Sequence, residues 1–205
     1  RLSSGLGEPS LNPYLSEIIR FISKTFPHLQ MGFFSNGFAL NQNGLLDTIV
    51  GNVNWINISL NAASSESYRV QCHINGFDRV SGNLSRLLAA KRERKTLMPL
   101  AMGSMVLNRK NLSDLPKMPA LCRRLGIDRL TIFPFFALGS HDPSKFGSDD
   151  TLAACMAQYE PLHEKTIEAS ERHRVSLEIP SPLSHSDSSF GMPQRKFYDF
   201  AQIES

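Results

Sequence analysis

The sequence predicts an α/β fold built on a mainly parallel sheet. Short β-branched and aromatic runs alternate along the chain with longer stretches whose apolar residues recur at helical spacing. Each strand-plus-helix unit takes roughly 25 to 45 residues, which suits right-handed βαβ connections. The composition is that of an ordinary globular protein, with 41% hydrophobic and 20% charged residues among 205. About six such units form either a doubly wound sheet or a partial barrel, and in both the loops after the strands carry the function.

The first half of the chain opens with a helix. Asn12 suits the N-cap, Pro13 suits the first helical position, and apolar residues at helical spacing continue until Pro27 ends the pattern. Three further elements are predicted in this half: a short buried strand at 31–34, a brief helix at 44–50 and a β-branched, aromatic strand at 53–60.

The second half continues the alternation. Pro116 and Pro119 should make the first turns of one of its helices irregular, and Gly126 should close that helix. The predicted elements are a helix at 77–88, a strand at 98–107, a helix at 112–125, a strand at 129–136, a helix at 151–173 kinked or broken at Pro161, and a strand at 175–179. From Ser181 onward Ser, Pro, His and Asp dominate, and we expect a loop or linker over 181–205.

Charge and cysteine usage indicate a cytoplasmic protein that binds neither nucleic acid nor membrane. The net charge of +3 is small, and the basic run 91–95 is interrupted by Glu93 and suits a solvated helix end. No apolar stretch approaches the roughly 18 residues of a membrane span. Cys72, Cys122 and Cys155 are few and widely spaced, as in a reducing compartment, and the last two fall on apolar helix stripes as expected of core residues.

Glycines and small polar side chains follow the predicted strands. Such groups let a ligand approach the backbone closely and offer hydrogen bonds, although turns and helix caps explain them as well. They are Gly5, Gly7, Glu8, Pro9, Ser35, Asn36, Ser59, Asn61 and Asn108. The six histidines are scattered, and no nucleophile arrangement, HExxH motif or Walker loop is present.

The order of these segments resembles one family. Residues 5–13 (GLGEPSLNP) are similar to a glycine–glutamate–proline signature that follows the second strand of that family. Ser35-Asn36-Gly37 is similar to the TNG turn of its third strand. The fourth strand and its helix are matched by 55–62 (WINISLNA), Tyr68-Arg69 and 76–80 (GFDRV). The fifth strand is matched by 105–108 and the sixth by 132–134. Five pieces in the right order over about Leu2 to Pro180 resemble the radical S-adenosylmethionine superfamily.

The resemblance implies a set of residues that bind S-adenosylmethionine. Gly7 and Glu8 would engage the amino group of its methionyl part, Ser59 its carboxylate or ribose, and Arg69 its carboxylate. Val106 with the backbone of Phe133 and Pro134 would flank the adenine. Asn61 stands where relatives carry aspartate, which argues against a charged role there. The strand-end residues named above complete the expected cofactor-binding set.

The resemblance also implies a [4Fe–4S] cluster held by a C-x3-C-x2-C loop after strand one. That strand and loop would lie before Arg1, so the chain is expected to be a fragment without metal ligands of its own. The implied fold is a partial parallel (β/α)6-type barrel missing its first strand and cluster loop. It would cover 1–180, and 181–205 would lead toward a C-terminal extension.

The implied function is formation of a 5′-deoxyadenosyl radical that abstracts hydrogen from a peptide or small-metabolite substrate, with electrons from an external donor such as flavodoxin or ferredoxin. The fragment alone would be inactive without the upstream cysteines. Two alternatives stay open: a non-catalytic barrel that has lost the cluster, and another α/β-barrel lyase.

Overall fold

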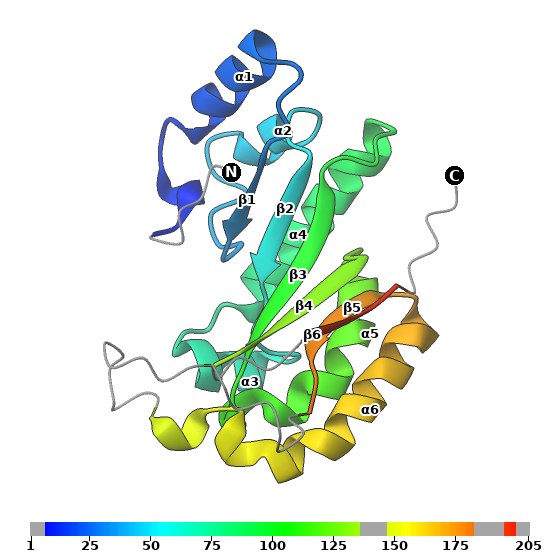
Figure 1. The fold of residues 1–205 in the computed structure, drawn as a ribbon. Coiled ribbons are helices and arrows are strands. Elements are labelled where there is room, and N and C mark those ends of the chain that lie inside the picture. Colours follow the sequence, from blue (N-terminus) through cyan, green and yellow to red (C-terminus); the bar gives the residue numbers. More distant parts are fainter. Residues whose placement is uncertain (1–6, 136–146, 183–194, 200–205) are drawn as a thin grey trace.

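Six strands form one sheet in the order β1-β2-β3-β4-β5-β6 (Figure 1). The computed structural model describes residues 7–135, 147–182 and 195–199. Strands β1 to β5 run parallel and β6 is antiparallel to β5. The strands are β1 (Gly32–Ser35), β2 (Trp55–Ser59), β3 (Leu100–Leu107), β4 (Arg129–Pro134), β5 (Ser176–Pro180) and β6 (Arg195–Tyr198).

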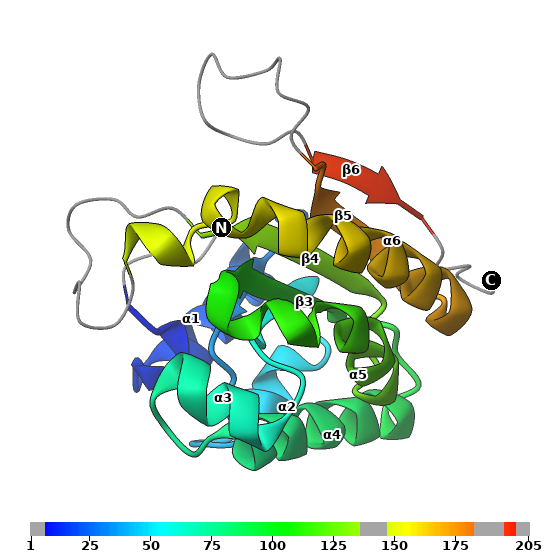
Figure 2. The ribbon, with the colours of Figure 1, turned by 90° about the horizontal axis from the view of Figure 1, so that it is seen from below.

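Helical segments connect the parallel strands, and the longer ones gather on one face of the sheet (Figures 1 and 2). The α-helices are α1 (Leu15–Thr25), α2 (Leu45–Ile49), α3 (Ser65–Cys72), α4 (Phe77–Glu93), α5 (Met118–Arg124) and α6 (Met156–His173). The 3-10 helices are η1 (Pro9–Leu11), η2 (Arg109–Lys117), η3 (Ser148–Asp150) and η4 (Ala153–Cys155). Within the described residues, no helix combines the length and the apolar character needed to cross a membrane.

The two faces of the sheet differ sharply in burial. Alternate strand residues such as Ile56, Met105 and Ile132 are fully buried under the helices. Their neighbours point to the other face, where Phe34 and Val106 are each 38% exposed. A doubly wound sheet would be covered with apolar side chains on both faces and would reverse its strand order once. The sequential order and the single covered face therefore identify a partial barrel, and we call its uncovered side the open face.

Most of the predicted elements are present, and the differences have local causes. Helix α3 was not anticipated because it buries only Tyr68 and Gln71, too few residues to create an apolar period; it begins instead at a capping box in which Ser64 and Ser67 bond each other's backbone. The irregular turns expected at Pro116 are the 3-10 helix η2, and Gly126 closes α5 with a φ of 63°.

Two expectations in the last third of the chain were wrong. Helix α6 continues through Pro161, which lies near its start, where the missing N–H costs one hydrogen bond. Residues 195–198, expected to belong to a loop, form strand β6, whose four residues pair with the edge of β5. Such a short, mostly exposed strand carries no apolar alternation, so its place in the sheet depends on β5.

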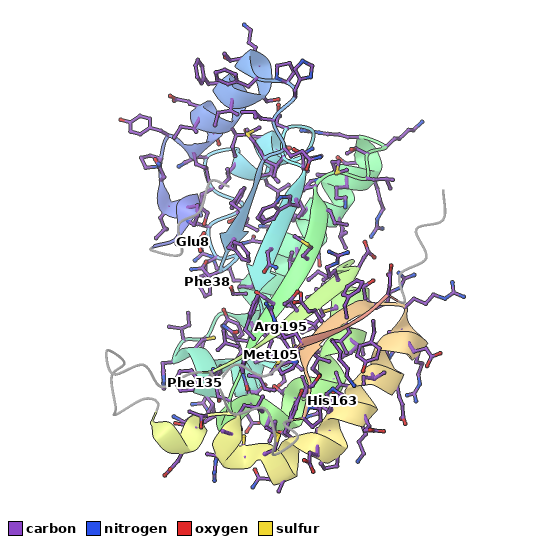
Figure 3. All side chains as sticks on the ribbon, viewed as in Figure 1. Glu8, Phe38, Met105, Phe135, His163 and Arg195 are labelled. Carbon is purple, nitrogen blue, oxygen red and sulfur yellow. The ribbon has the colours of Figure 1, made fainter. Side chains whose placement is uncertain are left out.

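His163 is a buried histidine of α6 (Figure 3). Its ring is 4% exposed and lies edge-on to Tyr159 at 5.6 Å between centroids, and neither ring nitrogen has a hydrogen-bond partner among the described residues. The Tyr159 hydroxyl donates to the carbonyl of Pro180 and so links α6 to the end of β5. Burial lowers the pKa of His163 below its ordinary 6.5, Glu164 opposes that change and Lys196 adds to it.

We expect this histidine to make the fold less stable in mild acid. Because the unfolded chain takes up the proton at higher pH than the folded chain, the contribution is fully present above pH 6.5 and is lost as the pH falls toward the lowered pKa. Urea unfolding at pH 7.5 and 5.5 should show a smaller loss of free energy of unfolding in His163→Leu than in the parent chain. An equal loss in both would contradict the assignment.

Candidate functional site

The carboxyl ends of β1, β2, β3 and β4 bring most of the predicted cofactor-binding residues to one edge of the sheet. Parallel strands all end at the same edge, so segments far apart in sequence meet there. Gly7, Glu8 and Pro9 precede and begin η1, which contacts β1. Ser35 and Asn36 end β1, and Ser59 ends β2. Gly5 lies outside the described residues.

The Glu8 carboxylate fastens η1 to the end of β1. Its Oε1 accepts hydrogen bonds from the Ser10 backbone N (3.1 Å), the Ser10 hydroxyl (2.5 Å) and the Ser35 hydroxyl (2.7 Å). Among the described residues, its Oε2 accepts one bond, from the Asn36 backbone N at 2.6 Å. Each oxygen of a carboxylate has about two acceptor positions. Oε2 therefore has room for a further donor, and most of this side chain's bonding is internal.

Asn61 joins the ends of β2 and β3. It adopts a left-handed φ of 57°, and its Oδ1 accepts from the Val106 backbone N at 2.9 Å. Asn111 of η2 completes the link, because its Nδ2 donates to the carbonyls of both Asn61 and Val106 at 2.9 Å. The Asn61 side chain therefore helps to hold these two strand ends together through an acceptor oxygen.

Ser59, Val106 and Phe133 lie on the open face near this edge. Ser59 pairs in register with Ser104, and Val106 with Phe133. Val106 is exposed, whereas Ser59 and Phe133 are half-buried. The structure thus presents one polar and two apolar side chains on three adjacent strands, an arrangement suited to a ligand with both characters.

The other predicted residues are Arg69, Asn108 and Pro134. Arg69 is exposed on α3 and forms no hydrogen bond to the strand-end group among the described residues. Asn108 is fully buried and caps η2, accepting from the Lys110 backbone N at 2.9 Å, so its side chain supports structure. Its Nδ2 has no partner among the described residues. Pro134 ends β4 beside Phe133 and pairs in register with Leu107.

Sequence reasoning missed a second group of polar residues farther from the carboxyl edge. They share the open face in the middle rows of the sheet: Asn57, Ser104, Arg129, Thr131, Glu178 and Arg195. Ser104 donates to the Oδ1 of Asn57 at 2.7 Å across β2 and β3. A signal was available, since polar residues at every second position of strands predicted to be buried indicate one face without an apolar cover.

The described residues do not form a metal site. No group of three His, Cys, Asp or Glu side chains there could hold an ion. Cys72 is half-buried on α3, and Cys122 and Cys155 are buried on α5 and η4. Burial raises the pKa of all three thiols, that of Cys122 to about 12, which disfavours the thiolate that a cluster requires. These residues therefore do not fit an iron–sulfur cluster.

The same burial predicts how the thiols react. Iodoacetamide at pH 8 should modify at most Cys72 in the folded chain, and slowly, because access and thiolate fraction are both low. All three cysteines should react in 8 M urea. Intact-mass spectrometry counts the adducts, and rapid native modification of Cys122 or Cys155 would contradict the packing described above.

The chain is similar to proteins described as probable GTP 3′,8-cyclases. One from Saccharolobus islandicus strain L.S.2.15 is 27% identical over 177 residues, and one from Saccharolobus solfataricus strain P2 is 25% identical over the same length. Each alignment covers 86% of this chain and 54% of the relative. The chain thus spans about half the length of the curated relatives it matches. No protein-family model matches it.

Solved structures share the fold. Streptococcus suis SuiB bound to S-adenosylmethionine superposes with a TM-score of 0.59 at 12% identity, over 83% of this chain and 36% of that one. A domain of pyruvate-formate lyase-activating enzyme from Bacteroides vulgatus gives 0.57 at 14% identity, over 85% of this chain and 95% of that one. Together with the order of motifs and the partial barrel, these similarities support membership of the radical S-adenosylmethionine superfamily.

Proposed function

We propose that this chain is the S-adenosylmethionine-binding part of a radical enzyme that abstracts hydrogen from a substrate. The observation that carries the proposal is that Glu8 is bonded to the end of β1, while Ser59, Val106 and Phe133 lie on the open face near the ends of β2, β3 and β4. The cofactor, when bound to a [4Fe–4S] cluster, supplies a 5′-deoxyadenosyl radical. Since the described cysteines do not fit that cluster, its ligands would come from another part of the protein.

The chemistry of the edge supports this ligand. S-adenosylmethionine carries an ammonium, a carboxylate, a ribose and an adenine, and so needs an acceptor, hydroxyl donors and apolar surface together. Glu8 Oε2 has spare acceptor capacity for the ammonium and Ser59 offers a hydroxyl. Val106 and Phe133 provide an apolar surface on which an adenine can pack. The chain's part is to bind and orient the cofactor.

The test is cofactor binding and cleavage by the product of the complete reading frame. The protein is reconstituted anaerobically with iron and sulfide, and S-adenosylmethionine binding, iron content and 5′-deoxyadenosine release are measured with dithionite as reductant. We expect roughly four irons per chain and released 5′-deoxyadenosine. Cofactor bound intact without iron would favour the non-catalytic barrel, and no binding at all would reject the proposal.

A matched pair of variants locates the binding to this edge. Glu8→Gln keeps the shape of the side chain but removes the charge that would face the ammonium, so binding should weaken by about tenfold or more. Glu93→Gln makes the same change at the exposed end of α4 and should leave binding unaltered. Equal affinities in the two variants would exclude Glu8 from the site.

A further inference from the structure

A cavity of about 520 Å3 occupies the open face on the amino-terminal side of the proposed cofactor edge. Among the described residues proposed for the cofactor, only Phe133 lines it, so cavity and cofactor edge adjoin without coinciding. We propose that this cavity binds a small aromatic molecule carrying a single anionic group. Its identity as the substrate of the enzyme rests on the proposed function, whereas the binding itself does not.

One wall of the cavity is aromatic. Phe34 and Trp55 line it and pack edge to face, with ring centroids 5.6 Å apart at 75°. Trp55 pairs in register with Gly32, and a Cβ on that glycine would lie 2.0 Å from the indole. Only glycine therefore lets the indole lie directly against β1. Phe34 remains 38% exposed, so this wall has apolar surface available for a flat ring.

The opposite wall holds an acid, Glu178, whose charge is paired. Glu178 Oε1 pairs with Arg195 Nη1 at 2.9 Å, and the Thr131 hydroxyl donates to Oε2 at 3.4 Å. The Arg195 guanidinium also lies over the Phe133 ring, 5.2 Å from its centroid (Figure 3 labels Arg195). Glu178 and Arg195 neutralise each other, and neither adds net charge to the cavity.

Arg129 supplies a positive charge at the cavity. Its side chain is exposed, it lines the cavity, and its guanidinium lies 5.1 Å from the Phe197 ring centroid. Among the described residues it forms no ion pair within 4.0 Å. Because the described residues leave one positive charge uncompensated at this cavity, we expect it to favour a ligand with a single anionic group, a carboxylate or a phosphate monoester, over a ligand with several such groups.

The aromatic wall and Arg129 lie in the same row of residues across the sheet. Phe34, Asn57, Met102 and Arg129 are successive partners across β1 to β4, so the aromatic wall and the cation stand at the two ends of one row. Met102 and Leu100 form the apolar floor between them. A ring packed on Phe34 and Trp55 would direct its anionic substituent along this row toward Arg129.

Trp55 offers a direct readout, because it is the single tryptophan of the 205-residue chain. Its fluorescence, excited at 295 nm, is followed while 3-phenylpropionate, phenyl phosphate or neutral 3-phenylpropionamide is added. None of these probes absorbs appreciably at that wavelength. We expect saturable changes with the two anions in the millimolar range, as befits fragments of this size, and weaker binding of the amide.

Arg129→Gln should weaken anion binding by about tenfold and leave the amide unaffected. Arg86→Gln removes the same charge from an exposed position on α4 and serves as the control. Gly32→Ala, which displaces the indole, should weaken all three probes. Preference for one anion over the other identifies the carboxylate or the phosphate as the native group.

Two results would overturn the inference: no saturable change with either anion, or equal effects of Arg129→Gln and Arg86→Gln. Circular dichroism of each variant verifies the fold before titration. Failure of this inference can be distinguished from failure of the proposed function. S-adenosylmethionine binding is measured in a separate experiment, with substitutions at other residues such as Glu8. Anion binding without cofactor binding would leave the cavity assignment standing and remove only its link to a radical enzyme.

Discussion

Met105→Asp is expected to abolish folding. Met105 lies in the middle of β3, fully buried beneath the helices, and belongs to the main hydrophobic core. An ionised carboxylate there would have no partner, and an unpaired buried charge costs about 3–5 kcal/mol, a large share of the stability of a domain this size. Loss of the cooperative thermal transition by circular dichroism, or recovery of the chain only in inclusion bodies, would be the observed result.

The adjacent residue provides the contrasting variant. Val106 follows Met105 on the same strand but points to the open face, where it is 38% exposed. Val106→Asp should therefore fold, with less than about 1 kcal/mol change in free energy of unfolding, while losing S-adenosylmethionine binding. Equal loss of folding in both variants would show that the second face is also covered, and the partial-barrel interpretation would fail.

The alternation of covered and open-face residues along each strand also explains how much of the fold could be predicted from the sequence. Ile56, Ile58, Ile132 and Leu177 belong to apolar runs, and such runs identify strands whichever face they cover. The order of strands and the binding loops follow from βαβ chirality once those runs are recognised. Ser59 could thus be placed at the end of a strand without coordinates, whereas Val106 was assigned from the family resemblance alone.

The open face was harder to predict because its residues have no uniform character. Asn57, Arg129 and Glu178 each resemble an interruption of a strand when taken alone. Only the register from β2 to β5 shows that they share one surface, and this register depends on contacts between segments 27 to 47 residues apart. Sequence periodicity contains no such long-range information.

Glu8 also shows that long-range contacts cannot be predicted from local sequence. Its place after two glycines predicts a ligand-binding carboxylate, and the segment does lie at the functional edge. Its bonds to Ser35 and Asn36 join residues 27 and 28 positions apart. Such bonds are decided by the packing of η1 on β1, which local sequence does not specify. A side chain can therefore belong to a binding loop and also hold that loop together.

Asn111→Asp should disrupt the cofactor edge without changing the size of a side chain. Asn111 is 1% exposed and uses both ends of its amide: Nδ2 donates to the carbonyls of Asn61 and Val106, and Oδ1 accepts from the Asn108 backbone N. Aspartate retains the acceptor but sets a second oxygen against two carbonyl oxygens at 2.9 Å. We expect a loss on the order of 3 kcal/mol in free energy of unfolding, measured in urea.

Asn111 links the ends of β2 and β3, so its substitution tests function as well as stability. Asn111 touches no proposed ligand, yet it holds the ends of β2 and β3 together where Ser59 and Val106 face the open side. Affinity for S-adenosylmethionine should fall under conditions in which the variant is still folded, because the two strand ends separate before the core melts. Asn41→Asp, at an exposed turn, introduces the same charge as a control. If Asn111→Asp lost stability but bound the cofactor normally below its melting temperature, the link between strand-end geometry and cofactor binding would be refuted.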